Sequence, residues 1–317
     1  MRTLIIGVGQ LGSRHAQSLA TLVDLEELIL VDPNPSSLEL ANGRVASTGY
    51  KGKVSTFTRL QHSVGQIELA VVSTSSIQRL SSLESVIEYS KPNHVLLEKL
   101  LTPSGTQLSE LESIIANSDS KFWVNCPMPF FDHYRYIEEA LSQTGDRRQL
   151  SYMVTGGNYG LVTNLIHYLD HFSKLSGSSL IDLRLRDGHQ LIQSKRAGYS
   201  EIIGCFFGET EKGDKFSVEF DPNKNGESLI IEISHGDSIF RIDEIGLVLH
   251  DGELNGRQAQ SPITTPRQSE LTHKSMELIL NGTSPMWANA DKSIELHRWI
   301  FSALEGSLSR SNDLSFT

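Results

Sequence analysis

The sequence predicts an α/β protein in which an N-terminal, doubly wound parallel sheet precedes a C-terminal α+β domain with a large, mainly antiparallel open sheet. Three observations lead to this prediction. Over the N-terminal third of the chain, short apolar runs alternate with helix-like stretches. A glycine-rich turn separates the first apolar run from the first helical stretch. Beyond residue 199, closely spaced apolar runs are separated only by short polar turns.

The N-terminal part contains five apolar runs that we expect to form strands. They are TLIIGVG, LEELILVD, KVSTF, IELAVVST and HVLLEK. Helical patterns follow the first run as far as Leu22 and cover residues 36–46 and 103–117, and a further run, KFWVNCP, comes after the last of them. Alternation of this kind predicts parallel βαβ units in a doubly wound sheet.

The pattern changes near Cys126 and Pro127, and we place the domain boundary at residue 122. A helical stretch at 131–143 is followed by the polar turn TGDRR, and later runs come in quick succession. These runs are YSEIIGCFFGET, KFSVEFD, SLIIEISHG, SIFRID and GLVLHDG. Short turns between alternating runs predict an antiparallel sheet of hairpins. Two helices, at 268–280 and 288–308, are expected to close the chain.

Composition excludes several classes of protein. The 317 residues include 28 basic and 38 acidic ones, and the net charge of −10 argues against a general binder of nucleic acid or anionic membranes. Two cysteines are too few for a disulfide framework or a four-cysteine zinc site. No apolar run has the length of a membrane span, and the start MRTLIIGVG lacks the layout of a signal peptide. We therefore expect a soluble, reduced, cytoplasmic protein.

The stretch GVGQLG has the G-x-G-x-x-G spacing of a dinucleotide-binding turn between a strand and a helix. Such a turn lets a pyrophosphate approach the backbone at the N-terminus of the following helix. The residues of this turn that we expect to contact the cofactor are Gly7, Gly9, Gln10, Leu11 and Gly12. Ser73 and Thr74, at the end of IELAVVST, are expected to join them. The alternative is a glycine-rich turn in an unrelated α/β protein.

Asp32 ends the second apolar run, 20 residues after Gly12. A carboxylate at this place accepts hydrogen bonds from the adenosine ribose and repels a 2′-phosphate. Since no Lys or Arg follows directly in DPNPSS, the sequence favours NAD(H) over NADP(H). We assign residues 1–122 to a Rossmann domain that binds NAD(P), and residues 123–317 to a second, α+β domain.

A charged pair, Glu98 and Lys99, ends the apolar run in VLLEKLLTP. A lysine at the end of a buried strand needs a partner or a function to offset its desolvation. Because neighbouring strand residues point to opposite faces, Glu98 is expected to make a contact separate from that of Lys99, to cofactor or backbone. The alternative for Lys99 is a side chain that extends along the surface into water.

The segment GVGQLGSRHA together with LLEKLLT resembles the Gfo/Idh/MocA family of oxidoreductases. The segments GGNYGLVTNLIHYLDH and KRAGYSEIIG and the ending LSFT extend the resemblance over essentially the whole chain. In that family a Glu-Lys pair, usually followed by proline, ends a strand beside the nicotinamide. Here Leu100 stands in the proline position. The pattern N-x-G-L-x-x-N-x-I-H resembles a subgroup linked to surface-polysaccharide and nonulosonic-acid sugar pathways.

The resemblance implies two catalytic residues, Lys99 and His167. Lys99 would stabilise developing alkoxide charge, and His167 would accept a proton. Relatives commonly carry an aspartate four residues before this histidine, where this chain has Thr163. That departure puts the usual acid–base relay in doubt. His167, Asp170 and His171 share a helix face by spacing, so a satisfied polar face and a metal site are alternatives, although no further ligand cluster is visible.

Further residues are candidates for substrate binding. They are Asn125, Asn158, Tyr159, Thr163, Asn164, Asp170, Lys195 and Arg196. Lys195 and Arg196 suit an anionic substrate group, and a solvated pair of loop charges is the alternative for them.

The resulting hypothesis is an NAD(H)-dependent oxidoreductase. It transfers hydride to or from a hydroxyl or carbonyl carbon of a sugar, cyclitol or nucleotide-linked sugar, without a metal. The alternatives are an inactive dinucleotide sensor of the same fold and an enzyme that uses retained NAD for transient oxidation. The family resemblance implies a homodimer or homotetramer formed through the second-domain sheet.

Overall fold

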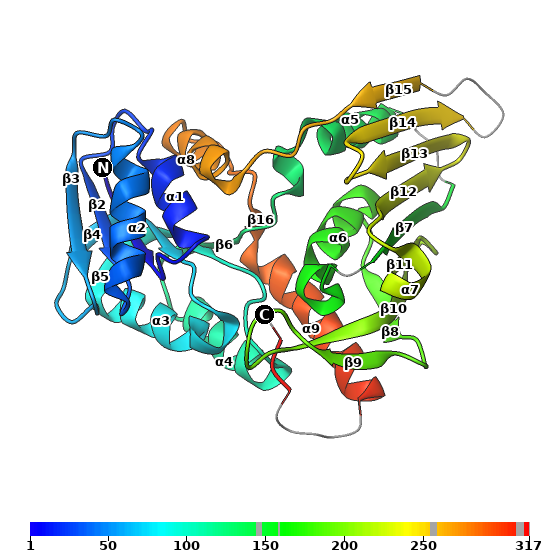
Figure 1. Ribbon diagram of the computed structural model, residues 1–317, viewed down its shortest axis with the longest axis horizontal. Coiled ribbons are helices and arrows are strands. Elements are labelled where there is room, and N and C mark those ends of the chain that lie inside the picture. Colours follow the sequence, from blue (N-terminus) through cyan, green and yellow to red (C-terminus); the bar gives the residue numbers. More distant parts are fainter. Residues whose placement is uncertain (144–147, 158, 254–258, 309–313, 317) are drawn as a thin grey trace. The chain divides into compact units, whose positions relative to one another are not determined.

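The computed structural model describes residues 1–143, 148–157, 159–253, 259–308 and 314–316 (Figure 1). The chain divides into two compact units. Unit 1 consists of Met1–Asn125 with Pro266–Ile294, and unit 2 consists of Cys126–Thr265 with Glu295–Phe316. The chain enters unit 2 at Cys126 and later returns to unit 1 for the segment Pro266–Ile294.

Unit 1 is built on a seven-stranded sheet in the order β16-β6-β5-β4-β1-β2-β3. Its strands are β1 (Arg2–Ile6), β2 (Glu27–Val31), β3 (Lys53–Phe57), β4 (Gly65–Val72), β5 (Ser90–Leu97), β6 (Lys121–Val124) and β16 (Ala288–Asn289). Strands β1 to β6 pair in parallel, and β16 adds an antiparallel edge beside β6. All five residues of β2 are buried, as expected for a strand with helices on both faces of its sheet. The predicted doubly wound parallel sheet is confirmed.

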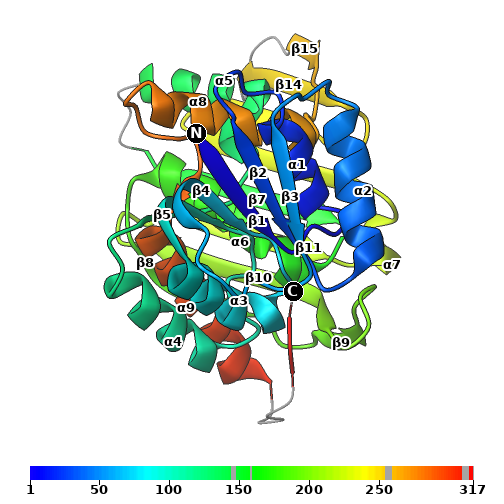
Figure 2. The ribbon, with the colours of Figure 1, turned by 90° about the vertical axis from the view of Figure 1, so that its left-hand side faces the viewer.

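Helices cover both faces of this sheet. They are α1 (Gly12–Leu19), α2 (Pro35–Ala46), α3 (Ser76–Tyr89), α4 (Gly105–Ala116) and α8 (Thr272–Leu280). Helices α1 and α2 lie on one face of the sheet and α3 and α4 on the other (Figure 2). Helix α8, from the returning segment, packs against α1.

Unit 2 contains, in its described residues, a nine-stranded sheet. Its strands are β7 (Leu150–Gly156), β8 (Leu180–Leu185), β9 (Gln190–Gln193), β10 (Ser200–Thr210), β11 (Lys215–Phe220), β12 (Leu229–His235), β13 (Ser238–Asp243), β14 (Val248–Glu253) and β15 (Ala259–Pro262). Every pairing is antiparallel except that of β7 with β11. The predicted large, mainly antiparallel sheet is confirmed.

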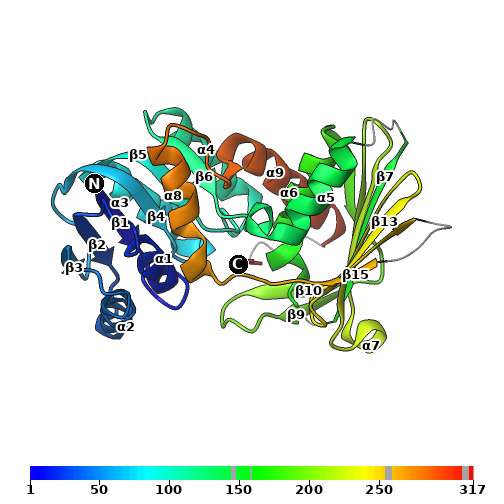
Figure 3. The ribbon, with the colours of Figure 1, turned by 90° about the horizontal axis from the view of Figure 1, so that it is seen from above.

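One face of this second sheet is packed against helices. The helices that contain residues of unit 2 are α5 (Asp132–Gln143), α6 (Leu161–Ser176), α7 (Pro222–Asn225) and α9 (Ala290–Ser307). Helix α6 packs on β7, β10 and β11, and it lies on the same side of the sheet as α5 (Figure 3). Along β7, Leu150, Tyr152 and Val154 are buried whereas Ser151 and Met153 are exposed. The alternation shows which side chains form the core between sheet and helices.

Candidate functional site

The carboxyl edge of the parallel sheet gathers all the residues that the sequence predicts to bind the cofactor. Strands β1, β2, β4 and β5 run in the same direction, so their carboxyl ends meet at one edge. The glycine-rich turn follows β1, Asp32 follows β2, Ser73 and Thr74 follow β4, and Glu98 and Lys99 follow β5. Ligands of open α/β sheets bind at this edge.

The glycines of the turn serve two different purposes. A Cβ at Gly12 would lie 2.0 Å from the carbonyl oxygen of Gly7, and one at Gly7 would lie 2.7 Å from the Thr74 nitrogen. These two positions need glycine for packing, and Gly7 also has a φ of +86°. A Cβ at Gly9 would meet no atom within 4 Å. Open space beside a bare backbone, next to the N-terminus of α1, fits a dinucleotide pyrophosphate.

The side chains around the turn hold it in place. The Ser73 hydroxyl donates to the Gly7 carbonyl at 2.9 Å. Arg44, from α2, donates to the Gln10 carbonyl at 2.7 Å and to its side-chain oxygen at 2.8 Å. Asp32 is 8% exposed and accepts the backbone N–H of Asn34 at 2.9 Å. The sequence analysis missed Arg44, because a contact of 34 residues' separation leaves no local pattern.

Glu98 is buried and tied to two side chains of unit 1. His15 Nε2 lies 2.8 Å from Glu98 Oε1, and the Asn125 amide donates to the same oxygen at 2.6 Å. Burial alone would raise the pKa of Glu98. The His15 hydrogen bond and charge, with smaller contributions from Arg79 and Asn125, hold that pKa below its usual range. Glu98 therefore carries its negative charge inside the protein.

The returning segment completes this buried network. His15 Nδ1 lies 2.8 Å from the Thr272 hydroxyl, and the Gln268 amide donates to that hydroxyl at 3.0 Å. Gln268 also accepts from the Asn125 amide at 3.0 Å. Both Glu98 and Asn125, predicted as ligand contacts, thus have protein partners here. Gln268 and Thr272 escaped the sequence analysis because they lie far along the chain from His15.

Lys99 follows this network directly. It is half-buried, between Glu98 and the fully buried Leu100 and Leu101. The peptide bond between Lys99 and Leu100 is cis. A partly desolvated ammonium at the carboxyl edge of the sheet has the chemistry required to donate to a substrate oxygen.

In unit 2, helix α6 carries most of the other candidates. Thr163, Asn164, His167 and Asp170 are half-buried. The intervals of four and three residues place Thr163, His167 and Asp170 on one helix face. His171 is different, since it is fully buried and its Nδ1 lies 3.0 Å from the Tyr152 hydroxyl. It belongs to the core, as one of the alternatives for this helix proposed.

Of the remaining substrate candidates of unit 2, Asn164 lies in the first turn of α6 and the others that the structure describes lie in loops. The Tyr159 hydroxyl donates to the carbonyl of Glu227, and its ring packs on Phe220. Asn164 donates to the carbonyl of Gly160 at 3.1 Å and to that of Tyr159. Lys195 and Arg196 are exposed between β9 and β10. Asn158 lies outside the described residues.

Glu201, which was not among the predicted site residues, lies in β10, and its carboxylate contacts the start of α6. Its carboxylate accepts the backbone N–H of Val162 at 3.0 Å and that of Thr163 at 2.9 Å. It also accepts the Thr163 hydroxyl and the N–H of Ile202. The sequence did contain a hint of this role. Glu201 directly precedes Ile202 and Ile203 in an apolar run, so a buried glutamate that needs hydrogen-bond partners could have been expected there.

Comparison with known proteins finds a family match for the N-terminal part of the chain. Residues 1–126 match the GFO_IDH_MocA family, described as "Oxidoreductase family, NAD-binding Rossmann fold". The resemblance seen in GVGQLGSRHA and LLEKLLT is thereby confirmed, and the family description supports a nicotinamide dinucleotide as cofactor. No curated protein matches the chain.

Solved structures share the fold over nearly the whole chain. UDP-N-acetylglucosamine 3-dehydrogenase GnnA from Acidithiobacillus ferrooxidans has 16% identity and a TM-score of 0.68, with 96% of each chain covered. An oxidoreductase from Agrobacterium radiobacter in complex with NAD+, L-tartaric acid and magnesium has 14% identity and a TM-score of 0.73, covering 96% of this chain and 97% of that one. Biliverdin reductase from Synechocystis sp. PCC 6803, in complex with biliverdin and NADP+, has 13% identity and a TM-score of 0.74, covering 96% and 98%. At these identities the likeness shows the two-sheet fold.

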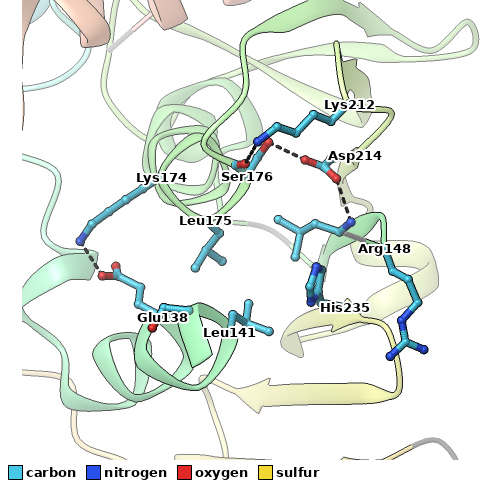
Figure 4. A pocket seen from close by; sticks show the side chains of 11 residues that line it. Glu138, Leu141, Arg148, Lys174, Leu175, Ser176, Lys212, Asp214 and His235 are labelled. Atoms are coloured by element: carbon cyan, nitrogen blue, oxygen red, sulfur yellow. Dashed lines mark hydrogen bonds and ion pairs between the residues drawn. The ribbon is translucent and has the colours of Figure 1, made fainter. Parts of the chain in front are cut away.

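Unit 2 also has a pocket that contains none of the predicted site residues. It lies at the C-terminal end of α6, where Lys174, Ser176, Asp214 and His235 are among its lining side chains (Figure 4). Lys174 pairs with Glu138 at 2.6 Å. Asp214 accepts the N–H of Leu150 at 2.9 Å and the Ser176 hydroxyl at 2.5 Å. These side chains hold α5, α6 and β7 to one another.

Two further classes of feature are absent from the described residues. No three His, Cys, Asp or Glu side chains there come together in a way that would hold a metal ion, so His167, Asp170 and His171 do not form such a cluster. No helix in the same residues is long and apolar enough to cross a membrane.

Proposed function

We propose that this protein is an NAD(H)-dependent oxidoreductase that acts on a hydroxyl or carbonyl carbon of a sugar, cyclitol or nucleotide-linked sugar. The observation that carries the proposal is the carboxyl edge of the unit 1 sheet. There, a glycine turn with open space at Gly9 and a carboxylate at Asp32 share one edge with the half-buried Lys99. A dinucleotide site and an oxyanion-stabilising cation at one sheet edge suit hydride transfer at a carbon–oxygen bond.

The preference for NAD(H) rests on Asp32. Its carboxylate follows β2 at the place where the adenosine ribose binds in this fold. It suits the 2′-hydroxyl as an acceptor and disfavours a 2′-phosphate. Arg44 contacts the glycine turn, where its guanidinium is hydrogen-bonded to Gln10.

The nicotinamide, when bound, would supply or accept the hydride. Lys99 donates a hydrogen bond to the reacting oxygen and stabilises the negative charge that develops on it. His167 takes the proton during oxidation and returns it during reduction. The sugar-like substrate class is supported by the resemblance of the α6 segment and by the dehydrogenase activity named for one structural neighbour, GnnA.

The test combines dinucleotide binding with turnover. NAD(H) and NADP(H) affinities are measured by calorimetry, and the absorbance of reduced nicotinamide is followed with a panel that includes UDP-N-acetylglucosamine and myo-inositol. We expect tighter binding of NAD(H) and turnover of a panel member. Lys99→Ala should lower kcat by roughly 10²–10⁴-fold while leaving NAD(H) affinity within a factor of about three.

Gly9→Ala tests the dinucleotide site separately from the fold. Its added Cβ meets no protein atom, so the melting temperature should not change. NAD(H) affinity should fall at least about tenfold, because the methyl group occupies the space that the pyrophosphate needs. Equal affinity in Gly9→Ala and wild type would overturn the proposed cofactor site. Tight NAD(H) binding without turnover of any panel member would instead favour a dinucleotide sensor.

A further inference from the structure

We propose that Glu201 is a positioning residue for the acid–base helix, and that it fixes the Thr163 hydroxyl as a hydrogen-bond acceptor on the helix face that carries His167. This inference rests on the proposed function, because it assigns a role within the same reaction. It concerns contacts inside unit 2 only, between strand β10 and helix α6.

The start of α6 is built around the Glu201 carboxylate. Gly160, the residue before the helix, has no side chain to cap it. Both oxygens of Glu201 take over this role by accepting the N–H groups of Val162 and Thr163. A Cβ at Gly160 would lie 3.1 Å from Glu201 Oε1, so the loop leaves room for the carboxylate.

Glu201 is held firmly in an unusual place for a glutamate. It is 4% exposed, and the donors described above are neutral N–H and O–H groups. Hydrogen bonds to a carboxylate are stronger than neutral ones, and the positive end of the helix dipole adds to them. The carboxylate therefore has a fixed position relative to the first turn of α6.

The bond from Thr163 to Glu201 determines what else Thr163 can do. A hydroxyl has one proton, and Thr163 gives it to Glu201, since an ionised carboxylate only accepts. Toward any third group, the Thr163 oxygen can then act only as an acceptor. His167 lies four residues later on the same face of α6. The donors that suit this face are an imidazole N–H and a substrate hydroxyl.

This arrangement supplies a carboxylate where the helix itself has none. Thr163 stands where relatives commonly carry an aspartate, so α6 lacks the acidic side chain of the usual acid–base relay. Here the Thr163 oxygen serves as the hydrogen-bond acceptor on this helix face. The negative charge next to it belongs to the Glu201 carboxylate, which lies in β10. The pair of Thr163 and Glu201 offers this acceptor to a donor group on the same face and leaves proton transfer to His167.

Thr163→Val tests the inference most directly. It removes the hydroxyl at nearly constant volume and keeps both backbone N–H bonds to Glu201. Glu201→Gln removes the charge, Thr163→Ser restores the hydroxyl, and Glu209→Gln is the matched control on the same strand, where Glu209 pairs with Lys215 at the surface. The readouts are kcat and KM with NAD+ and UDP-N-acetylglucosamine, the melting temperature, and the ring NMR signals of His167, assigned through His167→Gln.

We expect Thr163→Val and Glu201→Gln to lower kcat on the order of 10²-fold with little change in KM, because a displaced acid–base group costs rate more than binding. Thr163→Ser should recover most of the loss, and Glu209→Gln should behave as wild type. The His167 signals should shift in Thr163→Val and Glu201→Gln and return in Thr163→Ser.

If Glu201 only caps the helix, Glu201→Gln will lower the melting temperature while Thr163→Val keeps the wild-type kcat and His167 signals. That result would overturn the inference. The NMR arm needs no substrate, so it decides the question even if UDP-N-acetylglucosamine is not turned over. Absence of turnover in wild type with His167 signals that respond to Thr163→Val would count against the proposed function alone.

Discussion

At the scale of single residues, three buried charged side chains each require particular hydrogen-bond partners. Glu98, Glu201 and Arg79 are each nearly inaccessible, with exposures of 3%, 4% and 1%. Each is matched to partners from elsewhere in the fold: Glu98 to His15, Glu201 to α6, and Arg79 to the Val72 carbonyl at 2.7 Å. Burying such groups is costly unless every partner is present. These residues therefore specify one arrangement of the strand ends and helix starts around them.

These partnerships also mark the limit of what the sequence predicts about the site. The glycine turn and Asp32 could be found, because their chemistry depends on spacing within one βαβ unit. The contact of Glu201 with Thr163 spans 38 residues, and that of His15 with Thr272 spans 257. No local pattern encodes such pairs. They depend on strand order and on the return of the chain to unit 1.

His171 gives a prediction for stability against pH. Burial, and then the charges of Lys174 and His133, lower its pKa from 6.5 to about 3. Glu138 Oε1 lies 3.8 Å from its Nε2, and Tyr152 faces its Nδ1. The unfolded chain binds a proton near pH 6.5 and the folded chain does not. The contribution of His171 to the free energy of unfolding is thus complete above pH 6.5 and is lost progressively as the pH falls toward 3.

The expected loss between pH 7 and pH 5 is about 2 kcal/mol of unfolding free energy from this residue. Urea unfolding at a series of pH values measures it. His171→Asn should flatten the curve over this range, whereas the control His62→Gln, at an exposed position, should leave it unchanged. A curve for His171→Asn with the wild-type slope would show that His171 is not the group responsible.

At the scale of elements, several runs with a clear apolar period were predicted, but β7 was missed although its buried and exposed residues alternate. The runs KVSTF and SIFRID coincide with β3 and β13. Helix α3 was missed, because Ser76, Arg79 and Ser82 occupy buried positions and break its apolar stripe. Strands β8 and β9 were missed as well, since charged and exposed residues interrupt the alternation between Asp182 and Gln193.

Helix α2 provides a prediction at this scale. The Asn34 side chain accepts the N–H of Ser36 at 3.0 Å and caps the helix. Asn34→Ala should destabilise the protein by about 1 kcal/mol, because that N–H loses its protein partner. The control is Ser104→Ala at the start of α4, where the serine makes no side-chain cap, and its effect should stay within about 0.5 kcal/mol. Denaturant unfolding of both variants measures the difference, and equal effects would contradict the capping argument.

At the scale of the whole molecule, unit 1 is built from two separate stretches of the sequence. Unit 1 takes up Pro266–Ile294 after the second sheet has been completed. This segment supplies α8 against α1, strand β16 at the edge beside β6, and Gln268 and Thr272 to the Glu98 network. Two contiguous domains were the simplest interpretation of the sequence. A returning segment is invisible to pattern analysis, because its helix looks like any other amphipathic helix.

The returning segment should decide whether the dinucleotide unit is stable alone. Without it, Leu271 and Met276 are missing from the core and Glu98 loses part of its support. Burial of these two side chains is worth roughly 3–6 kcal/mol, which is comparable to the whole stability of many domains. We expect Met1–Asn125 alone to melt without a cooperative transition and to bind NAD(H) poorly.

The same residues joined by a flexible glycine–serine linker to Pro266–Ile294 should melt cooperatively and bind NAD(H) within about threefold of the full chain. As a control, the joined form with Met276→Asp should lose the gain. Cooperative melting of Met1–Asn125 by itself would show that the first unit does not need the returning helix, and would make the Glu98 network an addition to an already stable Rossmann domain.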